Sequence, residues 1–381
     1  MTSSPRISVL INNYNYGRFL GDAIDSVLTQ RDGFSSPERV EVVVVDDGST
    51  DSSAAVMARY GDRIVSVKKQ NGGQDSAFNA GFERCRGNII CLLDADDRFA
   101  RDKLSKIADC FECYPDIGWC FHPMMLEDLR TGKTIGKTRA FPGADRNRSQ
   151  HCDFREHLRF GQLPFYPTAT SGQCFRRSLL AQLLPMPETF ANTSADRYLR
   201  VAAVGLSPGY FLADVLTVQG IHDSNISTLR PERPSIPERQ IVVAYMLRTQ
   251  FPVLPPYANR LFSRGLSAYK KVMRQSRKRD GKALPPEDRT DLPFYKQPVE
   301  LSGDPLACRL ENYVEPGYKA MIRDYWRLCS PVEQAAIMLL RLYRKRPWRG
   351  GSLLDTHYYH FAQRQATAAK SKVAVTLPPR S

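Results

Sequence analysis

The sequence contains no apolar run of the roughly 18 to 20 residues that a bilayer-spanning helix needs, so it predicts no membrane-crossing segment. Its N-terminus, MTSSPRISVLINNYNYG, has one short apolar stretch and no small-residue cleavage site, which argues against a secretory signal peptide. We therefore expect a cytoplasmic protein.

Cysteine is also used in a way that excludes a disulfide scaffold. The nine cysteines form an odd and irregularly spaced set. The one CxxC pair, Cys110 and Cys113, has no second pair or histidine pair nearby to complete a tetrahedral zinc site, so we expect reduced thiols that pack in the core. With 42% hydrophobic and 25% charged residues, the 381-residue chain has an ordinary globular composition, which excludes a wholly disordered protein.

Excess positive charge is absent from the first part of the chain and concentrated in the last. Residues 1–230 hold 27 basic and 27 acidic residues, whereas residues 231–381 hold 27 and 13, which accounts for the net charge of +14. The densest clusters are KKVMRQSRKR (270–279) and RLYRKRPWR (341–349), and the second directly follows the apolar stretch AAIMLL. This order is typical of a basic amphipathic helix at the anionic inner face of the cell membrane. A solvated helical face is the plainer interpretation, and without a recognisable binding motif we expect no nucleic-acid partner.

Strand and helix patterns alternate in the first hundred residues. Four short runs are rich in β-branched residues, ISVLI (7–11), VEVVVVD (40–46), RIVSVKKQ (63–70) and NIICLLD (88–94). Helical patterns lie between them in RFLGDAIDSVLTQ (18–30) and DSAFNAGFERC (75–85). The predicted fold class is α/β, with a mostly parallel central sheet flanked by helices.

The remainder of the chain is less regular. Strands are expected in IGWCFHPMMLED (117–128), QCFRRS (173–178) and GYFLADVLTVQGI (209–221). Three prolines within residues 230–240 predict a linker. We therefore expect an α/β domain over residues 1–230 and a basic, mainly helical C-terminal region over residues 231–381 that docks an acceptor or a membrane.

Three carboxylates follow the strand that is predicted to be central. Asp94, Asp96 and Asp97 would lie at the carboxyl edge of the sheet, where open α/β sheets bind ligands. Three acids this close repel one another unless a cation or solvent neutralises them, and oxygen ligands suit Mg²⁺ or Mn²⁺. Acidic loop triplets are common, however, so the triplet alone is weak evidence for a metal.

Two further turns add polar groups at the same edge. In DDGSTD (46–51), Asp46 and Asp47 are placed to accept hydrogen bonds from a base or a ribose, while Ser49 or Thr50 is placed to cap a helix. In QNGGQDSAFNAGF (70–82), two glycines allow close backbone approach before a helix begins. A capped turn and a plain tight turn are the alternatives.

Taken together, ISVLINNYNYGRFLGDAIDSVLTQ, VVVVDDGSTD, QNGGQDSAFNAGF and RGNIICLLDADD resemble glycosyltransferase family 2, in order and spacing, over roughly residues 5–228. The resemblance implies a GT-A fold and a site for a nucleotide-sugar. Asn12 and Asn13 stand where the family usually has Pro-Thr, which changes the turn after the first strand, so the resemblance does not predict which base is selected. It implies that Asp96 ligates the divalent metal and that Asp97 supports it. The implied nucleotide-sugar residues are Asn13, Tyr14, Asn15, Asp46, Asp47, Gly73, Gln74, Asn79 and Asp94.

The resemblance also nominates residues from the later part of the chain. Asp196, in TSADRYLRVAAVG, would be the catalytic base, with a helix N-cap formed with Ser194 as the alternative. Here Ala-Asp stands where Glu-Asp is commoner. His222, in VQGIHDSNIS, would complete the metal or diphosphate site, and SGQCFRRS (171–178) would line the acceptor side of the cleft.

The implied function is a metal-dependent, inverting transfer of a sugar from a nucleotide-sugar, most simply a UDP-sugar, to a hydroxyl of a glycan or lipid-linked acceptor in polysaccharide biosynthesis. A sugar nucleotidyltransferase is one alternative, but it should carry a Gly-rich signature after the first strand, and NNYNYG is not one. A catalytically idle, membrane-docking scaffold of the same fold is the other.

Overall fold

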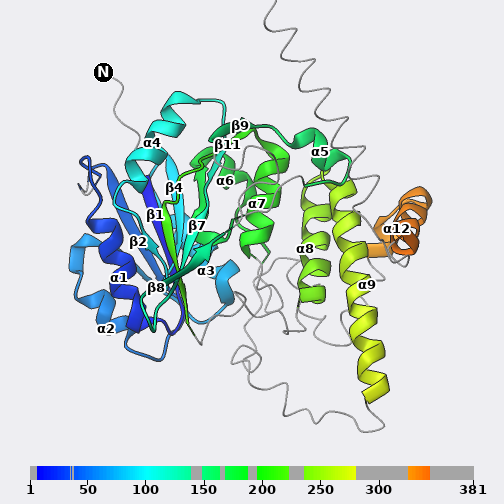
Figure 1. Cartoon of the computed structure of the whole chain (residues 1–381), viewed down its shortest axis with the longest axis horizontal. Helices are drawn as coiled ribbons and strands as arrows, with labels where there is room; N and C mark the ends of the chain where they lie inside the picture. The colour runs from blue at the N-terminus through cyan, green and yellow to red at the C-terminus, as the bar shows by residue number, and fades with distance from the viewer. Residues whose placement is uncertain are drawn as a thin grey trace, which may run out of the picture.

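The computed structural model describes residues 7–34, 36, 38–138, 148–163, 168–187, 195–222, 236–279 and 325–343 (Figure 1). Its centre is an eight-stranded sheet with the strand order β3-β2-β1-β4-β10-β6-β11-β9. A second, four-stranded sheet has the order β5-β12-β7-β8. The mixed α/β architecture that the sequence predicts is therefore confirmed.

The parallel half of the main sheet contains the four predicted strands. They are β1 (Ile7–Asn13), β2 (Val40–Asp46), β3 (Val65–Lys68) and β4 (Ile89–Asp94). Val9 of β1 is paired with Val42 of β2 on one side and with Cys91 of β4 on the other. Because helices cover both faces, β2 is buried along its whole length, which explains its continuous run of valines.

The other half of the main sheet is mixed. Its strands are β10 (Gln173–Arg176), β6 (Trp119–Phe121), β11 (Gly209–Phe211) and β9 (Gln150–Cys152). β10 runs antiparallel to both β4 and β6. The beginning of β10 consequently lies beside the carboxyl end of β4, which brings residues 170–173 to the edge where β4 ends.

Two of the later segments in which the sequence predicts strands are each divided between the sheets. Residues 117–128 form β6 and then β7 (Met124–Asp128), separated by His122 and Pro123, since proline has no N–H to continue a ladder. Residues 209–221 form β11 and then β12 (Thr217–Ile221). The second sheet, completed by β5 (Arg98–Phe99) and β8 (Lys133–Lys137), therefore reaches the acidic turn after β4.

Helices cover the main sheet on both faces. On one face, an apolar cluster joins β1, β2 and β4 to α1 (Gly17–Leu28), α2 (Ser53–Ala58) and α4 (Lys103–Cys113). On the other face, a second cluster joins the strands to α3 (Gly73–Arg84), α6 (Arg177–Leu183) and α7 (Ala195–Leu206). The short α5 (Arg155–Arg159) follows β9.

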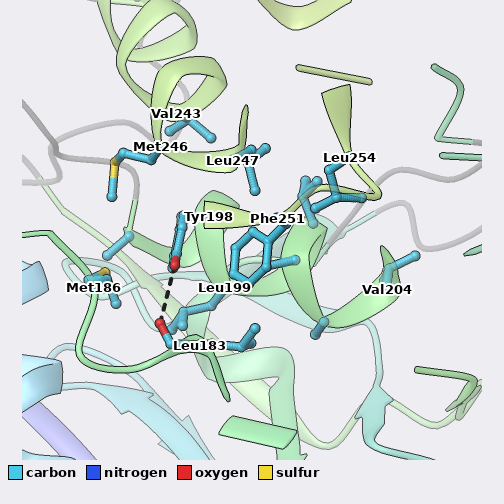
Figure 2. Packing of buried hydrophobic residues seen from close by; sticks show 14 of the residues in the cluster. Leu183, Met186, Tyr198, Leu199, Val204, Val243, Met246, Leu247, Phe251 and Leu254 are labelled. Carbon is cyan, nitrogen blue, oxygen red and sulfur yellow. Dashed lines mark hydrogen bonds between the residues drawn. The ribbon is translucent and has the colours of Figure 1, made fainter. Parts of the chain in front are cut away.

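The helices after residue 235 pack on this second face. They are α8 (Ile236–Gln250), α9 (Pro255–Arg279) and α12 (Pro331–Tyr343), and side chains of all three belong to the same apolar cluster as α7. Figure 2 shows Tyr198 and Leu199 of α7 beside Met246 and Leu247 of α8. α8 begins inside the segment predicted as a linker, so residues 236–240 are helical instead, because their helix is stabilised by packing against α7.

Among the described residues, no helix combines the length and the apolar character that crossing a membrane requires. The eight cysteines within the described ranges are all free, and Cys110 is buried while Cys113 is exposed. The basic cluster 270–279 lies in α9, whereas residues 344–349 of the second cluster lie outside the described residues.

Close packing of β11 against β6 gives a test of the mixed half of the sheet. A Cβ atom added at Gly209 would lie 2.0 Å from Cδ2 of Trp119, so Gly209→Ala should lower the free energy of unfolding by about 1 to 3 kcal/mol. Gly136→Ala, where no atom lies within 4 Å of the added Cβ, is the matched control and should be nearly neutral. Urea unfolding measures both; equal stability of the two variants would contradict this packing.

Candidate active site

The centre of the candidate site is the acidic turn at the end of β4. Carboxylate oxygens of Asp94, Asp96 and Asp97 all lie within 4.8 Å of one another. The backbone N–H of Asp97 donates to the Asp94 carbonyl at 3.0 Å, which closes the turn and keeps the three side chains together. The sequence prediction that these acids form one cluster is confirmed.

Groups from three other elements hold this turn. Ser171, in the 3₁₀ helix η2 (Thr170–Gly172), accepts from the backbone N–H of Asp94 at 2.9 Å and donates to Oδ2 of Asp97 at 2.6 Å. The N–H of Gly220 in β12 donates to the other oxygen of Asp97 at 3.0 Å. Asp97 is only 2% exposed, so its carboxylate is bound by the protein, as expected for a residue that supports the other two acids.

A buried lysine lies behind the acidic turn. Lys103 of α4 is fully buried and donates from Nζ to the Ser171 carbonyl at 2.8 Å and to Oγ1 of Thr217 at 3.2 Å. Nζ also lies 3.4 Å from the centroid of the Phe99 ring. Burial lowers the pKa of Lys103. The sequence analysis did not nominate this lysine, because nothing in the pattern of α4 distinguishes it from a surface residue.

Burial and mutual repulsion disturb the ionisation of the cluster. Desolvation, and then the charge of Asp96, raise the pKa of Asp94 to about 7, although hydrogen bonds from Asn12 and Thr170 oppose the rise. Desolvation and the same neighbouring charges also raise the pKa of Asp97. Three oxygen-bearing acids whose negative charges are this poorly compensated fit a hard divalent cation such as Mg²⁺ or Mn²⁺.

His222 follows β12 and lies beside the acid cluster, while its role at a metal or diphosphate stays a prediction. Its Nε2 lies 3.0 Å from Oδ2 of Asp96, and both side chains are largely buried. The imidazole packs against the rings of Phe19, at a centroid distance of 4.6 Å, and Tyr16, at 5.4 Å. Tyr16 is a site residue that the sequence analysis missed; desolvation, and then the charges of Asp96 and Asp94, raise the pKa of its hydroxyl.

The ends of β1 and β2 form a polar corner beside this cluster. Nδ2 of Asn13 donates to Oδ1 of Asp46 at 3.1 Å and to the Ser49 hydroxyl at 3.2 Å. The hydroxyl of Ser49 also accepts from the backbone N–H of Asn15 at 2.8 Å. Asn15 is exposed and has a φ of 57°, a backbone conformation that asparagine tolerates better than most residues.

Ser49 and Thr50 do not cap a helix, contrary to the sequence prediction. α2 begins at Ser53, and Oδ1 of Asp51 accepts from the Ser53 backbone N–H at 2.9 Å, while Oδ2 accepts from the N–H of Gly17 at 2.8 Å. Asp51 therefore serves the start of both α1 and α2. Ser49 instead lies beside the end of β1, where its hydroxyl accepts hydrogen bonds from Nδ2 of Asn13 and from the backbone N–H of Asn15.

Asp47 is buried at the start of the glycine turn. Its carboxylate accepts from the backbone N–H groups of Gly72 at 2.9 Å and Gly73 at 2.7 Å, and it forms an ion pair with Lys69 at 2.6 Å. Desolvation raises the pKa of Asp47, and Lys69 acts in the opposite direction. Gly73 has a φ of +87°, which explains the need for glycine at this position.

The two remaining predicted residues of α3 have different surroundings. Nε2 of Gln74 donates to Oδ1 of Asp94 at 3.1 Å, so this residue belongs to the cluster. The side chain of Asn79 is 8% exposed and exchanges two hydrogen bonds with the backbone of Met186, at 2.8 and 2.9 Å. Its role toward a nucleotide-sugar stays a prediction.

Asp196 lies in the first turn of α7, and its charge adds to the causes that raise the pKa of Asp94. Its Oδ2 forms an ion pair with Nη1 of Arg200 at 2.6 Å, and its Oδ1 accepts from the N–H of Arg197 at 2.7 Å. Nε2 of Gln173 donates to its carbonyl at 3.4 Å. The alternative N-cap partner, Ser194, lies outside the described residues.

The arginines of the 171–178 segment are structural. Arg176 donates to the carbonyls of Ile117 and Phe111 at 3.0 Å each, and Arg177 donates to the carbonyl of Cys85. Neither is a surface charge, and they point toward the end of the sheet opposite the acids. Within this segment, Ser171 is the residue that reaches the candidate site.

The fold and the acid cluster define a GT-A-type glycosyltransferase domain. Residues 8–183 match the model of the family described as "Glycosyl transferase family 2", and this part of the chain belongs to that family. The family that the sequence motifs indicate is thereby confirmed.

Individual relatives agree with this assignment. An uncharacterized glycosyltransferase of Nostoc sp. is 32% identical over 229 residues, which are 58% of this chain and 66% of the relative. The minor teichoic acid biosynthesis protein GgaA of Bacillus subtilis is 36% identical over 110 residues, 27% of this chain and 24% of the relative. Both matches span less than two thirds of the relative's length.

Among solved structures, residues 1–349 of TarS from S. aureus, in complex with UDP-GlcNAc, have a TM-score of 0.52 at 17% identity. The match covers 71% of this chain and 74% of that chain. At this identity the likeness concerns the fold.

Cation binding at the cluster should stabilise the protein in a pH-dependent way. Because the folded-state pKa of Asp94 rises from 3.8 to about 7, the ionised carboxylate progressively destabilises the metal-free fold as the pH increases through that interval. A cation removes this repulsion and displaces protons. The increase in Tm caused by Mn²⁺ should therefore be larger at about pH 8 than at about pH 5.5.

Two variants make this measurement specific. Asp96→Asn should lose most of the Mn²⁺-induced increase in Tm, which for the unaltered chain corresponds to about 2.7 kcal/mol at a Mn²⁺ concentration of about 100 times Kd. Asp62→Asn, which changes an exposed acid in the 3₁₀ turn Gly61–Arg63, should keep the whole increase. The same increase in both variants would show that Mn²⁺ binds elsewhere.

Proposed function

We propose that the protein transfers a sugar, with inversion, from a UDP-sugar to an acceptor hydroxyl in a metal-dependent reaction. The observation that carries this proposal is the hydrogen bond at 3.4 Å from Nε2 of Gln173 to the Asp196 carbonyl, because Gln173 follows η2, whose Ser171 binds the backbone N–H of Asp94. A carboxylate fit to accept a proton and an acid cluster fit to hold a cation thus share the space at the carboxyl end of β4.

The donor would lie along the ends of β1, β2 and β4. In this proposal, Asn13, Tyr14, Asn15 and Asp46 line the base and ribose, and Gln74 positions Asp94 toward the ribose. Asp47 acts indirectly in this proposal: its carboxylate binds the N–H groups of Gly72 and Gly73 and so fixes the glycine turn beside the nucleotide. The complex of TarS with UDP-GlcNAc supports UDP as the nucleotide.

Asp96, together with His222 and its two acidic neighbours, would hold Mn²⁺ or Mg²⁺. When bound, the cation offsets the negative charge that develops on the departing diphosphate. The chain itself keeps the cluster in place: Ser171 and Gly220 bind Asp97, and the rings of Tyr16 and Phe19 pack on the imidazole of His222.

Asp196 would take the proton from the acceptor hydroxyl as that oxygen attacks the anomeric carbon. Arg200 holds Oδ2 at 2.6 Å and is itself anchored to the Thr168 carbonyl at 3.0 Å, so the carboxylate has a fixed orientation. A single displacement from the face opposite the nucleotide inverts the anomeric configuration. The relationship to a protein named for teichoic acid biosynthesis supports a surface-polymer acceptor.

Removal of the proposed base tests this assignment. Asp196→Asn should lower kcat by a factor of about 10² to 10⁴, the usual contribution of a general base, while the affinity for UDP stays within about twofold. Asp62→Asn serves again as the exposed control and should keep full activity. Transfer by Asp196→Asn within about tenfold of the unaltered rate, or a product that keeps the donor's configuration, would refute the mechanism.

The alternatives make different products. A sugar nucleotidyltransferase would release pyrophosphate from UTP and a sugar phosphate. The proposed enzyme would release UDP and should slowly hydrolyse UDP-sugar when no acceptor is present. An idle scaffold would show neither turnover nor Mn²⁺-dependent UDP binding.

We also propose that α12 rests on an anionic membrane surface. One side of this helix is anchored by Ile337, which is buried, while Val332, Met338 and Leu339 are 79%, 55% and 56% exposed. The sequence RLYRKRPWR begins at the end of the helix and supplies five basic residues and a tryptophan. Exposed apolar side chains followed by basic residues suit the boundary between acyl chains and anionic headgroups.

A partly buried ion pair keeps α12 in this orientation. Arg248 of α8 binds Glu333 of α12 at 2.8 Å and also donates to Oδ1 of Asn259 in α9 at 3.0 Å. The hydrogen bond from Arg248 lowers the pKa of Glu333 to about 2. The ion pair therefore fixes which side of α12 contacts α8 and α9, and Figure 1 shows α12 outside these two helices.

Vesicle sedimentation tests this contact. The protein should sediment with vesicles that contain anionic lipid and not with neutral vesicles, and added salt should weaken the binding. Met338→Ser/Leu339→Ser should abolish most of it, whereas Val65→Ser, at another exposed apolar residue, should not. Binding that is absent, or unchanged in the α12 variant, would exclude α12 as the contact.

A further inference from the structure

Lys103 of α4 lies fully buried at the point where three elements beside the acid cluster meet. Its Nζ donates to the Ser171 carbonyl of η2 at 2.8 Å and to Oγ1 of Thr217 in β12 at 3.2 Å. It also lies 3.4 Å from the centroid of the Phe99 ring in β5. An ammonium group has three donors, and two acceptors with one ring face match that number. The side chain is therefore fully engaged inside the protein.

Each of these three contacts leads directly to the acidic turn. The hydroxyl of Ser171 donates to Oδ2 of Asp97 at 2.6 Å. Phe99 follows Asp97 by two positions in the chain. Thr217 pairs with Phe99 in the ladder between β12 and β5, and it shares its strand with Gly220, whose N–H donates to Asp97 at 3.0 Å. The lysine thus joins all three elements that surround the acids on this side.

Stability of the fold does not account for a lysine in this place. Among the described residues, lysines 69 and 106 form ion pairs with aspartates, whereas Lys103 pairs with no carboxylate. A buried cation without a counter-ion is costly, and an apolar side chain of similar size is commonly as stable or more so. The contacts of Lys103 therefore indicate a role in holding its neighbours in position.

Ser171 is the link between the lysine and the acids. Its carbonyl accepts from Lys103 and, at 3.0 Å, from the Thr217 hydroxyl. Its own hydroxyl accepts from the backbone N–H of Asp94 at 2.9 Å while it donates to Asp97. Because both polar groups of Ser171 are bound, a shift of η2 away from the lysine would also move the hydroxyl away from the acids.

We propose that Lys103 is a positioning residue that acts through Ser171 and keeps the acidic turn in the arrangement that binds a divalent cation. The inference rests on the proposed function, in which this turn holds Mn²⁺ or Mg²⁺. The positive charge of Lys103 by itself opposes a second cation, so removal of the charge alone would tighten cation binding. Loss of position would weaken it, and the sign of the change separates the two effects.

Titration of the full chain with Mn²⁺, followed by the electron paramagnetic resonance of the free ion, tests the inference. Lys103→Met should weaken Mn²⁺ binding by about tenfold, the lower end of the usual cost of losing a partner behind the metal ligands. The Tm of the metal-free protein should not fall, because the Ser171 carbonyl keeps the Thr217 hydroxyl as its donor. Lys106→Met, on the same helix, removes a lysine that binds Asp102 and Asp214 and should leave Mn²⁺ binding unchanged.

Hydrogen exchange of the metal-free proteins reports the position of the turn directly. A peptide that spans residues 92–99 should exchange faster in Lys103→Met, since the Asp94 N–H is bound by the Ser171 hydroxyl, while β2 should exchange as before. Thr217→Val keeps the lysine but removes one of its acceptors, so it should show smaller changes in the same direction. This variant carries the test if Lys103→Met does not fold.

A pair of variants tests the link through Ser171. Lys103→Met/Ser171→Ala should bind Mn²⁺ no more weakly than Ser171→Ala alone, because the lysine acts through the residue already altered. Additive losses would show that Lys103 acts by another route and would overturn the inference.

Two further results would contradict it. Unchanged or tighter Mn²⁺ binding by Lys103→Met would overturn the inference and leave the proposed function intact, and a lower Tm in that variant would then assign the lysine to stability alone. If the unaltered chain itself fails to bind Mn²⁺, the metal-dependent function and the inference both fail.

Discussion

The repulsion among three carboxylates at the end of β4 is the constraint on which the site depends. Asp94, Asp96 and Asp97 are brought within 4.8 Å of one another in a turn that is largely removed from water. Such an arrangement is unfavourable in isolation, because burial and like charge both oppose ionisation. It persists because neighbouring elements donate hydrogen bonds to it and because a divalent cation can neutralise it.

The second sheet supplies one of those neighbouring elements. β12 passes beside the turn, and its Gly220 N–H donates a hydrogen bond to Asp97. The Ser171 hydroxyl of η2 donates to Asp97 and accepts from the backbone N–H of Asp94. Lys103 in turn donates a hydrogen bond to the Ser171 carbonyl. The second sheet and the start of β10 are thus parts of one frame around the acids.

Local patterns in the sequence predict the parallel half of the fold well. The valine run of β2 and the apolar stripe of α1 are each determined by burial against neighbours close in the chain, and the strand-end acids follow from the same register. The division of residues 117–128 and 209–221 between two sheets is not visible in this way, because it depends on pairing with distant strands. The helix that begins at Ile236 inside a proline-rich segment likewise depends on packing against α7.

In the candidate site, too, local motifs predict some features, whereas others depend on contacts between distant segments. Motif context pointed to the acids and His222 as candidates. It could not reveal that Asp47 holds the glycine turn or that Ser49 binds two asparagines instead of capping a helix. Lys103 carries no local signal, since a charged residue on an amphipathic helix is ordinary. Its surroundings become apparent only when segments more than 60 residues apart are brought together.

The most direct measurement of the central claim is anomalous diffraction from crystals of the full chain grown with Mn²⁺ and UDP. The account predicts a manganese peak between the Asp96 carboxylate and the diphosphate, with Asp196 facing the vacant acceptor side of the same cleft. A manganese peak remote from Asp96, or UDP bound at another edge of the sheet, would contradict it.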